Sequence, residues 1–289
     1  MFAAMRIIFL ASHIILSTTT PVTVYNNAYF NPINTNYLLS NLSSITSVND
    51  CLCQCYDNAI CFTANYFYTT HRCILFFAQL NQGQLQVAPA TVNASVYSFG
   101  NSNNTTVAFF NRTNETVYNI WNTTAGGSSV YAVSGYSVGS YWPAGSGQTA
   151  FDGDLTTALC SYGTCDFTGS SQSCGEKTGF YLTMNGGSKI LAGFQMSSSS
   201  VTWSRVRDPM VITIEGSNLN GSALTLGSSW TLIYNGSAGF ITDPGRAAWG
   251  ILQSISNPSI AFASYRLLVT LKEGGDSCPS FSELQFVML

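Results

Sequence analysis

The chain has 289 residues, of which 8% are charged and 13% are aromatic, and its formal net charge is −3. Phosphate recognition needs clustered Lys and Arg, so the ten such residues, which form no basic patch, exclude a nucleic-acid ligand. The aromatic content excludes a disordered chain, which would be poor in these residues.

The length suits two domains of roughly 100–200 residues each, and the histidines restrict their chemistry. His13 and His71 are the only two in the sequence. A His-rich zinc site is therefore excluded, and a Ser-His-Asp triad could use only His71. Because no base is placed to activate one of the many Ser and Thr residues, we predict that the protein is not an enzyme.

Residues 1–18 are predicted to be a secretory signal peptide. Arg6 supplies the positive charge of the N-terminal region of a signal peptide, and Ile7–Leu16 is a mostly apolar run about as long as its hydrophobic region. That run is shorter than the roughly 20 residues that cross a bilayer, and no later stretch is long enough either. The alternative is an apolar N-terminus that is not cleaved.

Glycans and disulfides are expected in a secreted chain, and nine cysteines agree with an oxidising compartment. Six of the nine Asn-x-Ser/Thr sequons fall between Asn93 and Thr124, which predicts an exposed, glycosylated connector over residues 100–127. The sequons are at Asn41, Asn93, Asn103, Asn104, Asn111, Asn114, Asn122, Asn220 and Asn235.

Residues 43–99 form the first predicted domain. Asp50 is the expected N-cap of a helix over Cys51–Asn58. The first and third cysteines of this helix are four residues apart and share one face, whereas Cys53 points to the opposite side. Two runs rich in aromatic and branched residues predict strands, at Cys61–Tyr68 and Cys73–Leu80.

This order of cysteines, helix and strands resembles the PAN/apple module. The resemblance implies a helix joined to a small antiparallel sheet by the bridges Cys51–Cys73 and Cys55–Cys61. The outer cysteine pair of the module is missing here, so the alternative is an unrelated small disulfide-bonded unit. Cys53 is left over, and is either buried and free or paired with another chain in a disulfide-linked dimer.

The connector contains two apolar runs, Val107–Phe110 and Val117–Trp121. They could pair as a hairpin around Asn111–Thr116, or dock as edge strands on a neighbouring domain. A bare flexible linker would not carry three large aromatic residues.

Residues 128–289 contain short strand candidates separated by Gly, Ser, Asn and Pro, without a long helical period. This pattern predicts a β-sandwich or jelly roll. The expected fold class is therefore mainly β, with a small disulfide-stapled α+β unit in front. The candidates are Gly179–Met184, Leu191–Met196, Met210–Glu215, Ser229–Tyr234, Tyr265–Leu271 and Phe281–Val287.

Four motifs follow one another in this second domain. They are Asp152-Gly153-Asp154 with two threonines after it, Arg207-Asp208-Pro209 with a strand ending Glu-Gly-Ser-Asn, Tyr265-Arg266-Leu267, and the closing Ser282-Glu283-Leu284-Gln285-Phe286. In this order they resemble the discoidin family (coagulation factor 5/8 type C, galactose-binding-like domains), over about Val130 to Leu289. The resemblance implies a binding module.

The resemblance also implies a structural Ca²⁺ ion, held in related carbohydrate-binding domains by the early Asp-Gly loop and the closing Glu. Carried over by position, the ligands are Asp152, Asp154, Thr157 and Glu283, which are oxygen donors of the kind that Ca²⁺ prefers. The alternative is a loop held by hydrogen bonds alone, with Glu283 capping backbone amides.

The same loop predicts two disulfides. If it meets Glu283 at one ion, Cys160 just after the loop is brought near Cys278 just before that glutamate. A Cys160–Cys278 bridge then leaves Cys165–Cys174 as a local one, among the three pairings that four cysteines allow.

The ligand surface implied by the resemblance is a set of loops at one end of the sandwich. Sugar-binding relatives stack an aromatic ring on the sugar and bond its hydroxyls with Arg, Asp or Asn. Trp203 with Arg205 is the first candidate, and Tyr141-Trp142 is the second; the alternative is that both Trp side chains pack in or over the core. Arg207-Asp208 is expected to be structural, and Trp230 to lie in the core.

We therefore expect a secreted glycoprotein that binds carbohydrate or glycoprotein through loops of the discoidin-like domain. One alternative is a structural or adhesive matrix protein that acts by protein contacts and is linked through Cys53. Another is peripheral binding to phospholipid, which exposed apolar loop tips would favour.

Overall fold

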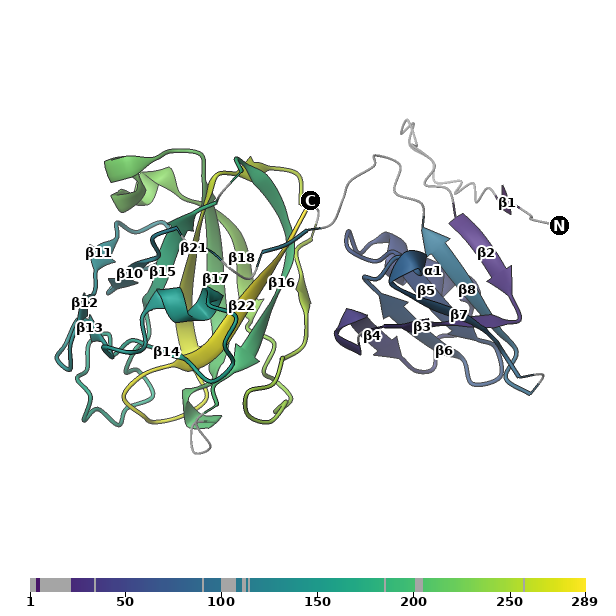
Figure 1. The fold of residues 1–289 in the computed structure, drawn as a ribbon, viewed down its shortest axis with the longest axis horizontal. Helices are drawn as coiled ribbons and strands as arrows, with labels where there is room; N and C mark the ends of the chain where they lie inside the picture. Colours follow the sequence, from purple (N-terminus) through teal and green to yellow (C-terminus); the bar gives the residue numbers. More distant parts are fainter. Residues whose placement is uncertain are drawn as a thin grey trace. The chain divides into compact units, whose positions relative to one another are not determined.

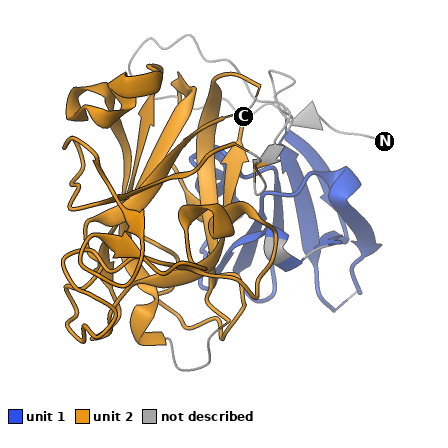
Figure 2. Ribbon diagram, turned by 60° about the vertical axis from the view of Figure 1, so that its left-hand side comes forward, with its two compact units in different colours: residues 1–106 blue, residues 107–289 orange. Residues whose placement is uncertain are grey.

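The computed structural model of the chain describes residues 4–5, 22–33, 35–89, 91–99, 108–110, 113, 115–184, 186–200, 205–256 and 258–289. These residues are mainly β, as the sequence predicts, with one α-helix among them. The chain divides into two compact units, residues 1–106 and 107–289 (Figure 2). The predicted signal peptide lies outside the described residues except for the short strand β1 (Ala4–Met5).

The first unit is built on a six-stranded antiparallel sheet with the order β1-β2-β8-β5-β6-β4 (Figure 1). Strands that precede residue 43 belong to this sheet, so the unit begins earlier than the predicted domain. The strands are β2 (Val22–Asn26), β4 (Leu38–Leu42), β5 (Thr63–Phe67), β6 (Arg72–Phe76) and β8 (Ala94–Phe99), and β3 (Ala28–Pro32) pairs with β7 (Gly83–Val87) in a separate ribbon.

The helix α1 (Val48–Tyr56) begins three residues before the predicted start. Its N-cap is Ser47 and not Asp50: the Ser47 hydroxyl accepts from the Asp50 backbone N–H at 3.2 Å and donates to the Asp50 carboxylate at 2.8 Å. A serine followed three residues later by an acid is a capping-box pattern, which explains the shift. Hydrogen bonds from Thr46 and Ser47 lower the pKa of Asp50.

Two disulfides hold α1 to the rest of the first unit. Cys51–Cys73 joins the helix to β6, and Cys55–Cys61 joins it to the segment before β5, as the PAN/apple resemblance implies. Both helix cysteines are buried in one apolar cluster that includes Tyr66. A unit of this size has a thin core and depends on such bridges.

The second unit is a β-sandwich. One sheet has the order β11-β10-β15-β21-β17-β18, and the other has the order β14-β22-β16-β19, with β9 on β22 and β20 on β16 (Figure 1). The first sheet consists of β10 (Tyr118–Trp121), β11 (Val130–Tyr131), β15 (Thr178–Thr183), β17 (Pro209–Ser217), β18 (Thr231–Ser237) and β21 (Ser264–Lys272). The second consists of β9 (Ala108–Phe110), β14 (Leu159–Cys160), β16 (Lys189–Ser198), β19 (Gln253–Ser254), β20 (Ala261–Phe262) and β22 (Ser280–Met288).

The core of the sandwich lies between the two sheets. Phe180 and Leu267 enter it from the first sheet, and Phe194 and Phe286 enter it from the second; all four side chains are at most 1% exposed. Burying each such side chain contributes about 1.5–3 kcal/mol. Trp230 is also buried, as predicted, but in a separate cluster with Tyr181 and other residues.

The two apolar runs of the predicted connector are strands of the sandwich. β9 pairs with β22 in one sheet, and β10 pairs with β11 and β15 in the other, so the predicted hairpin between them is wrong. The reason is burial. Phe110 packs on Phe151 and on Phe286 of β22, whereas Ile120 is fully buried in the cluster of Tyr181, which lies on β15 in the other sheet.

Small ribbons and turns complete the second unit. β12 (Val133–Ser134) pairs in parallel with β13 (Ser140–Tyr141). The 3₁₀ turns are η3 (Gly147–Phe151), η4 (Arg205–Arg207), η5 (Gly221–Thr225) and η6 (Gly227–Ser229). None of the helices in the described residues has the length and apolar character that crossing a membrane requires.

Candidate functional site

Several loops of the second unit meet at one end of the sandwich. Strand register places them there, because Pro209 at the start of β17 is opposite Lys272 at the end of β21. The loop end, as we call it, consists of residues 161–174, 205–208, 241–249 and 272–279. In Figure 1 these segments lie along the lower side of the larger unit.

Arg205, the predicted hydrogen-bond donor to a sugar, lies at this end and is held by acidic neighbours. It contacts the Asp243 carboxylate at 3.0 Å and the Glu273 carboxylate at 3.5 Å, and its side chain is 45% exposed. The hydrogen bond with Asp243 raises the pKa of Arg205 further above its usual value. Trp203, its predicted aromatic partner, lies outside the described residues.

Arg207 and Asp208 both form ion pairs, in agreement with the structural role expected of them, but they do not pair with each other. Arg207 contacts Asp276 at 2.8 Å. Asp208 accepts two hydrogen bonds from Arg246, at 2.7 and 2.6 Å, and Arg246 also contacts Asp243 at 2.8 Å. The hydrogen bonds with Asp208 raise the pKa of Arg246. These ion pairs join η4 to the 241–249 and 272–279 loops.

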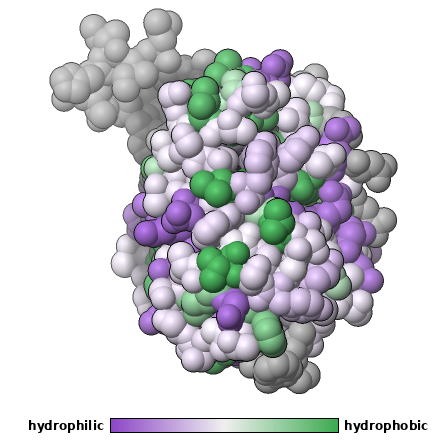
Figure 3. Space-filling model, turned by 90° about the vertical axis from the view of Figure 1, so that its left-hand side faces the viewer, coloured by the Kyte–Doolittle hydropathy of each residue, from purple (hydrophilic) through white to green (hydrophobic). Residues whose placement is uncertain are grey.

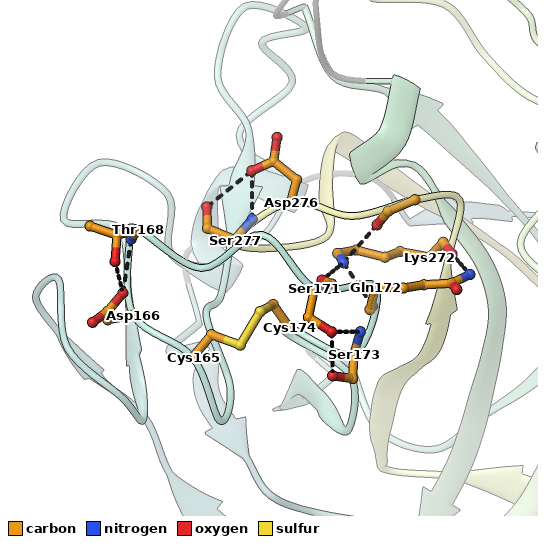
Figure 4. The surroundings of a disulfide bond; sticks show 11 residues. Cys165, Asp166, Thr168, Ser171, Gln172, Ser173, Cys174, Lys272, Asp276 and Ser277 are labelled. Atoms are coloured by element: carbon orange, nitrogen blue, oxygen red, sulfur yellow. Dashed lines mark hydrogen bonds between the residues drawn. A yellow bond between two sulfur atoms is a disulfide. The ribbon is translucent and has the colours of Figure 1, made fainter.

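A buried lysine fixes the disulfide loop of the same end (Figure 4). Lys272 is fully buried, and its ammonium donates to the carbonyls of Ser171, Gln172 and Gly274 at 2.7, 2.7 and 2.8 Å. The Cys165–Cys174 bridge closes this loop. Burial lowers the pKa of Lys272, and three carbonyl partners satisfy all three of its donors.

Trp142 presents an aromatic ring beside the loop end. The side chain is 42% exposed, and its backbone N–H donates to the Cys160 carbonyl at 2.9 Å. A Cβ on Gly145 would lie 3.1 Å from the ring, so a larger residue there would press on the indole. Tyr141 is half-buried and bridges to Ser161. The structure thus exposes Trp142 more than its neighbour.

The fold brings the four predicted calcium ligands together. Their side chains form hydrogen bonds with groups of the 152–157 loop, as in the alternative without an ion. Glu283 accepts from the backbone N–H groups of Gly153 and Asp154 at 2.8 and 3.0 Å. Asp152 accepts from the Asp154 N–H and from the Thr157 hydroxyl, both at 2.8 Å. The side chains suit calcium in kind, but their oxygens accept from the donors of the loop itself.

No group of three or more His, Cys, Asp or Glu side chains suited to a metal ion occurs in the described part of the chain. Burial, together with the adjacent Asp152 carboxylate, raises the pKa of Glu283 to about 8. Calcium binding would require this carboxyl to be ionised and the hydrogen bonds of the loop to be exchanged for the ion, and it stays a prediction.

Two bridges hold the loops of the second unit. Cys160–Cys278 ties β14 to the segment before β22 across 118 residues, and Cys165–Cys174 spans 9. Both are the pairs expected from the sequence. In the chain-entropy model, closing the longer loop lowers the entropy of the unfolded chain and so stabilises the folded unit by about 5 kcal/mol.

Sequence reasoning missed the acidic and basic partners at the loop end. Asp243 and Arg246 come from the turn Asp-Pro-Gly-Arg, and Glu273 and Asp276 come from the turn Glu-Gly-Gly-Asp. In a chain with 8% charged residues, two turns with a charge at each end are a signal that could have found them.

The predicted glycosylation sites divide into two groups. Asn41, Asn93, Asn122, Asn220 and Asn235 are exposed, as an acceptor must be. Asn103, Asn104, Asn111 and Asn114 lie outside the described residues.

Cys53 is the one free cysteine in the described part of the chain, and it is partly exposed.

Comparison with known families confirms the resemblance of the first unit. The family model of the PAN domain matches residues 25–101, which begins upstream of the predicted start at Ser43. No curated protein matches the chain.

Several solved structures are similar to the chain. A CBM32-3 module from a family 31 glycoside hydrolase of Clostridium perfringens is 15% identical, with 56% of this chain and 90% of that one covered and a TM-score of 0.39. A family 32 carbohydrate-binding module of the same organism, in complex with galactose, is 10% identical over 51% and 88% of the chains, with a TM-score of 0.34. Another, in complex with GalNAc-β-1,3-galactose, is 18% identical over 49% and 83%, with a TM-score of 0.33.

Proposed function

We propose that the second unit binds a neutral carbohydrate through the loop end, as a non-catalytic recognition module of a secreted glycoprotein. The exposed ring of Trp142 is the surface against which the apolar face of a sugar stacks. The electron-rich face of an indole attracts the polarised C–H groups of such a ring. Arg205 and its acidic partners belong to the loop end and would offer hydrogen-bonding groups for sugar hydroxyls.

The observation that carries the proposal is that the basic side chains of the loop end already have partners. Arg205, Arg207 and Arg246 contact carboxylates, and Lys272 donates to three carbonyls. A sulfated or sialylated glycan, or an anionic lipid headgroup, needs positive charge that is not already compensated. A neutral ligand needs none, so uncharged sugars fit this end best.

The proposal that the module is non-catalytic is supported by the carboxylates of the loop 152–157. A pair of acids that hydrolyses a glycosidic bond faces the substrate across a cleft. Here Glu283 accepts from backbone N–H groups, and Asp152 accepts from the Thr157 hydroxyl. Both acids therefore stabilise the loop through hydrogen bonds and do not face each other across a substrate cleft.

Binding to a phospholipid surface is a second candidate, because one aromatic pair near the loop end is exposed. Tyr136 and Phe167 contact edge to face, with ring centroids 5.7 Å apart, and are 54% and 58% exposed. Co-sedimentation with phosphatidylcholine vesicles, with and without phosphatidylserine, tests this alternative. Binding that is lost in Phe167→Ala would favour it over the sugar.

A glycan array probed with the whole secreted chain tests the main proposal. Galactose and GalNAc, present in two of the similar structures, are the first sugars to examine. We expect selective binding of neutral glycans that falls at least tenfold in Trp142→Ala. The matched control is Tyr56→Ala, an aromatic residue that is 59% exposed in the first unit and should leave binding unchanged. Equal loss in both variants would refute a role for the loop end.

A further inference from the structure

A second aromatic surface lies on the sandwich, away from the loop end. Tyr118 of β10, Tyr131 of β11 and Tyr181 of β15 come from three neighbouring strands of one sheet, and we call them the tyrosine platform. Strand register places Tyr118 opposite Tyr181, and Tyr131 opposite Ile120 next to it. Tyr118 and Tyr131 are 44% and 49% exposed, whereas Tyr181 is 2% exposed beneath them.

The rings of the platform are held in place before any ligand binds. Tyr118 stacks on Tyr181 with ring centroids 4.9 Å apart and an interplanar angle of 16°. The hydroxyls of Tyr131 and Tyr181 are hydrogen-bonded at 2.7 Å. Tyr181 in turn packs on Trp230, at 5.8 Å between centroids. Because Tyr118 and Tyr131 are already held in place, their side chains would lose little rotamer entropy when a ligand binds, which favours affinity.

The platform lies on the outer face of its sheet. In β15, the neighbours Phe180 and Leu182 point into the sandwich core, and Tyr181 points the opposite way. On that outer face Trp230 and Leu224 cover part of the sheet, and Trp230 donates to the Leu224 carbonyl at 3.0 Å. The cover supplied by η5 and η6 leaves Tyr118 and Tyr131 exposed.

The charged pair next to Trp230 on this face is buried and neutralised. Arg266 and Glu215 form an ion pair at 2.7 Å, and their side chains are 0% and 1% exposed. The Arg266 guanidinium lies over the ring of Trp230, 4.7 Å from its centroid. The groups that the platform itself offers to a ligand are therefore aromatic rings and phenol hydroxyls. These groups are uncharged, so they suit an uncharged ligand.

The exposed area of the platform is small. A tyrosine offers roughly 150–250 Å², so two half-exposed rings present about 200 Å², whereas a stable protein interface buries about 800 Å² on each partner. Figure 3, which faces the side of the sandwich where β10 and β11 lie, shows hydrophobic residues as separate spots and not as one broad patch. The platform therefore suits one or two sugar rings better than a protein.

We propose that the tyrosine platform is a second carbohydrate-binding site, for neutral sugar rings that stack on Tyr118 and Tyr131 and hydrogen-bond to their hydroxyls. It is independent of the site at the loop end, because it stands on the face of the sheet and uses none of the residues of those loops. One chain would then bind two glycans.

The test compares the wild-type chain with two sets of variants on an array of neutral galacto-, gluco- and manno-oligosaccharides. In Tyr118→Ala/Tyr131→Ala we expect at least one glycan to bind tenfold more weakly, while the same glycan is retained by Trp142→Ala. Tyr118→Phe/Tyr131→Phe keeps the rings and should retain more binding than the Ala pair. Leu232→Ala is the matched control, since Leu232 is 51% exposed on another strand of the same sheet.

Thermal unfolding of each variant separates loss of binding from loss of fold, and the Phe pair remains informative if the Ala pair is unstable. The proposal is overturned if the wild-type chain binds none of these glycans, or if the folded platform variants bind every glycan as the wild type does. Loss in Trp142→Ala alone would support the loop end and overturn the platform.

Discussion

At the scale of single residues, the carboxyl of Glu283 is buried beside another carboxylate. It is 2% exposed, next to Asp152, and burial raises its pKa to about 8 from a usual 4.5. Between these values the folded protein keeps a proton that the unfolded chain releases. Stability from this group is therefore fully present below about pH 4.5 and is lost as the pH rises toward 8.

We predict that the melting temperature falls between pH 5 and pH 8, and that Glu283→Gln removes most of this slope. The amide keeps an acceptor for Gly153 and Asp154 but does not titrate. Thermal unfolding across this range, in chelator, checks the prediction, and a slope that is the same in both proteins would contradict it.

Calcium changes this result if it binds. An ion held by Glu283 would displace the proton, so added calcium should raise the melting temperature at pH 8 in the wild type and not in Glu283→Gln. An equal lack of response in both proteins would count against the calcium site.

The ion pairs of the loop end provide a second prediction at this scale. The Asp208 side chain is 3% exposed, and its removal leaves the guanidinium of Arg246 with one carboxylate partner, Asp243. Asp208→Ala should lower the free energy of unfolding by roughly 3 kcal/mol. Arg205→Ala breaks pairs on a side chain that is 45% exposed, so its cost should be below about 1 kcal/mol. Urea denaturation measures both, and equal costs would contradict the burial argument.

At the scale of elements, the start of α1 depends on one hydroxyl. Ser47 caps the helix through the Asp50 N–H, and the helix carries two disulfide cysteines of the first unit. Ser47→Ala should cost about 1 kcal/mol, whereas Gln54→Ala, at an exposed position within the same helix, should cost little. Denaturation of the oxidised chain measures the difference, and a neutral Ser47→Ala would show that the bridges alone fix the helix.

The same helix carries Cys53, which leads to a prediction about assembly. It is the free cysteine of the described chain and is partly exposed. If the protein acts as a linked matrix component, a dimer should run on a non-reducing gel, collapse with thiol, and be absent in Cys53→Ser. A monomer in every lane would remove Cys53 as a link between chains and count against the linked-matrix alternative.

At the scale of the whole molecule, local patterns predicted the helix and many of the strands, and the two family resemblances implied the disulfide pairs. Helix spacing placed Cys51 and Cys55 on one face, because that relation depends on a short segment of chain. The pairing of Cys160 with Cys278 across 118 residues instead came from the discoidin resemblance, which implied that the 152–157 loop meets Glu283. The upstream strands β2, β3 and β4 were missed, because each is only five residues long and polar residues interrupt its apolar ones.

Long-range contacts were not predictable in the same way. The separation of β9 and β10 into different sheets depends on which sheet buries Phe110 and which buries Ile120, and neighbours in sequence do not decide that. The pairing of Asp208 with Arg246 joins two loops, and the stacking of Tyr118 on Tyr181 joins two paired strands, so both contacts unite residues that are far apart in the sequence.

The most direct test of the central claim is a titration of the whole chain with the neutral glycan that the array selects, at 50 and 500 mM salt. The claim is that a neutral sugar stacks on Trp142 at an end whose basic groups are already paired. We predict a saturable isotherm that changes less than about twofold with salt, because little charge is neutralised on binding, and that weakens at least tenfold in Trp142→Ala. An affinity that falls steeply with salt, or that Trp142→Ala leaves unchanged, would contradict the account.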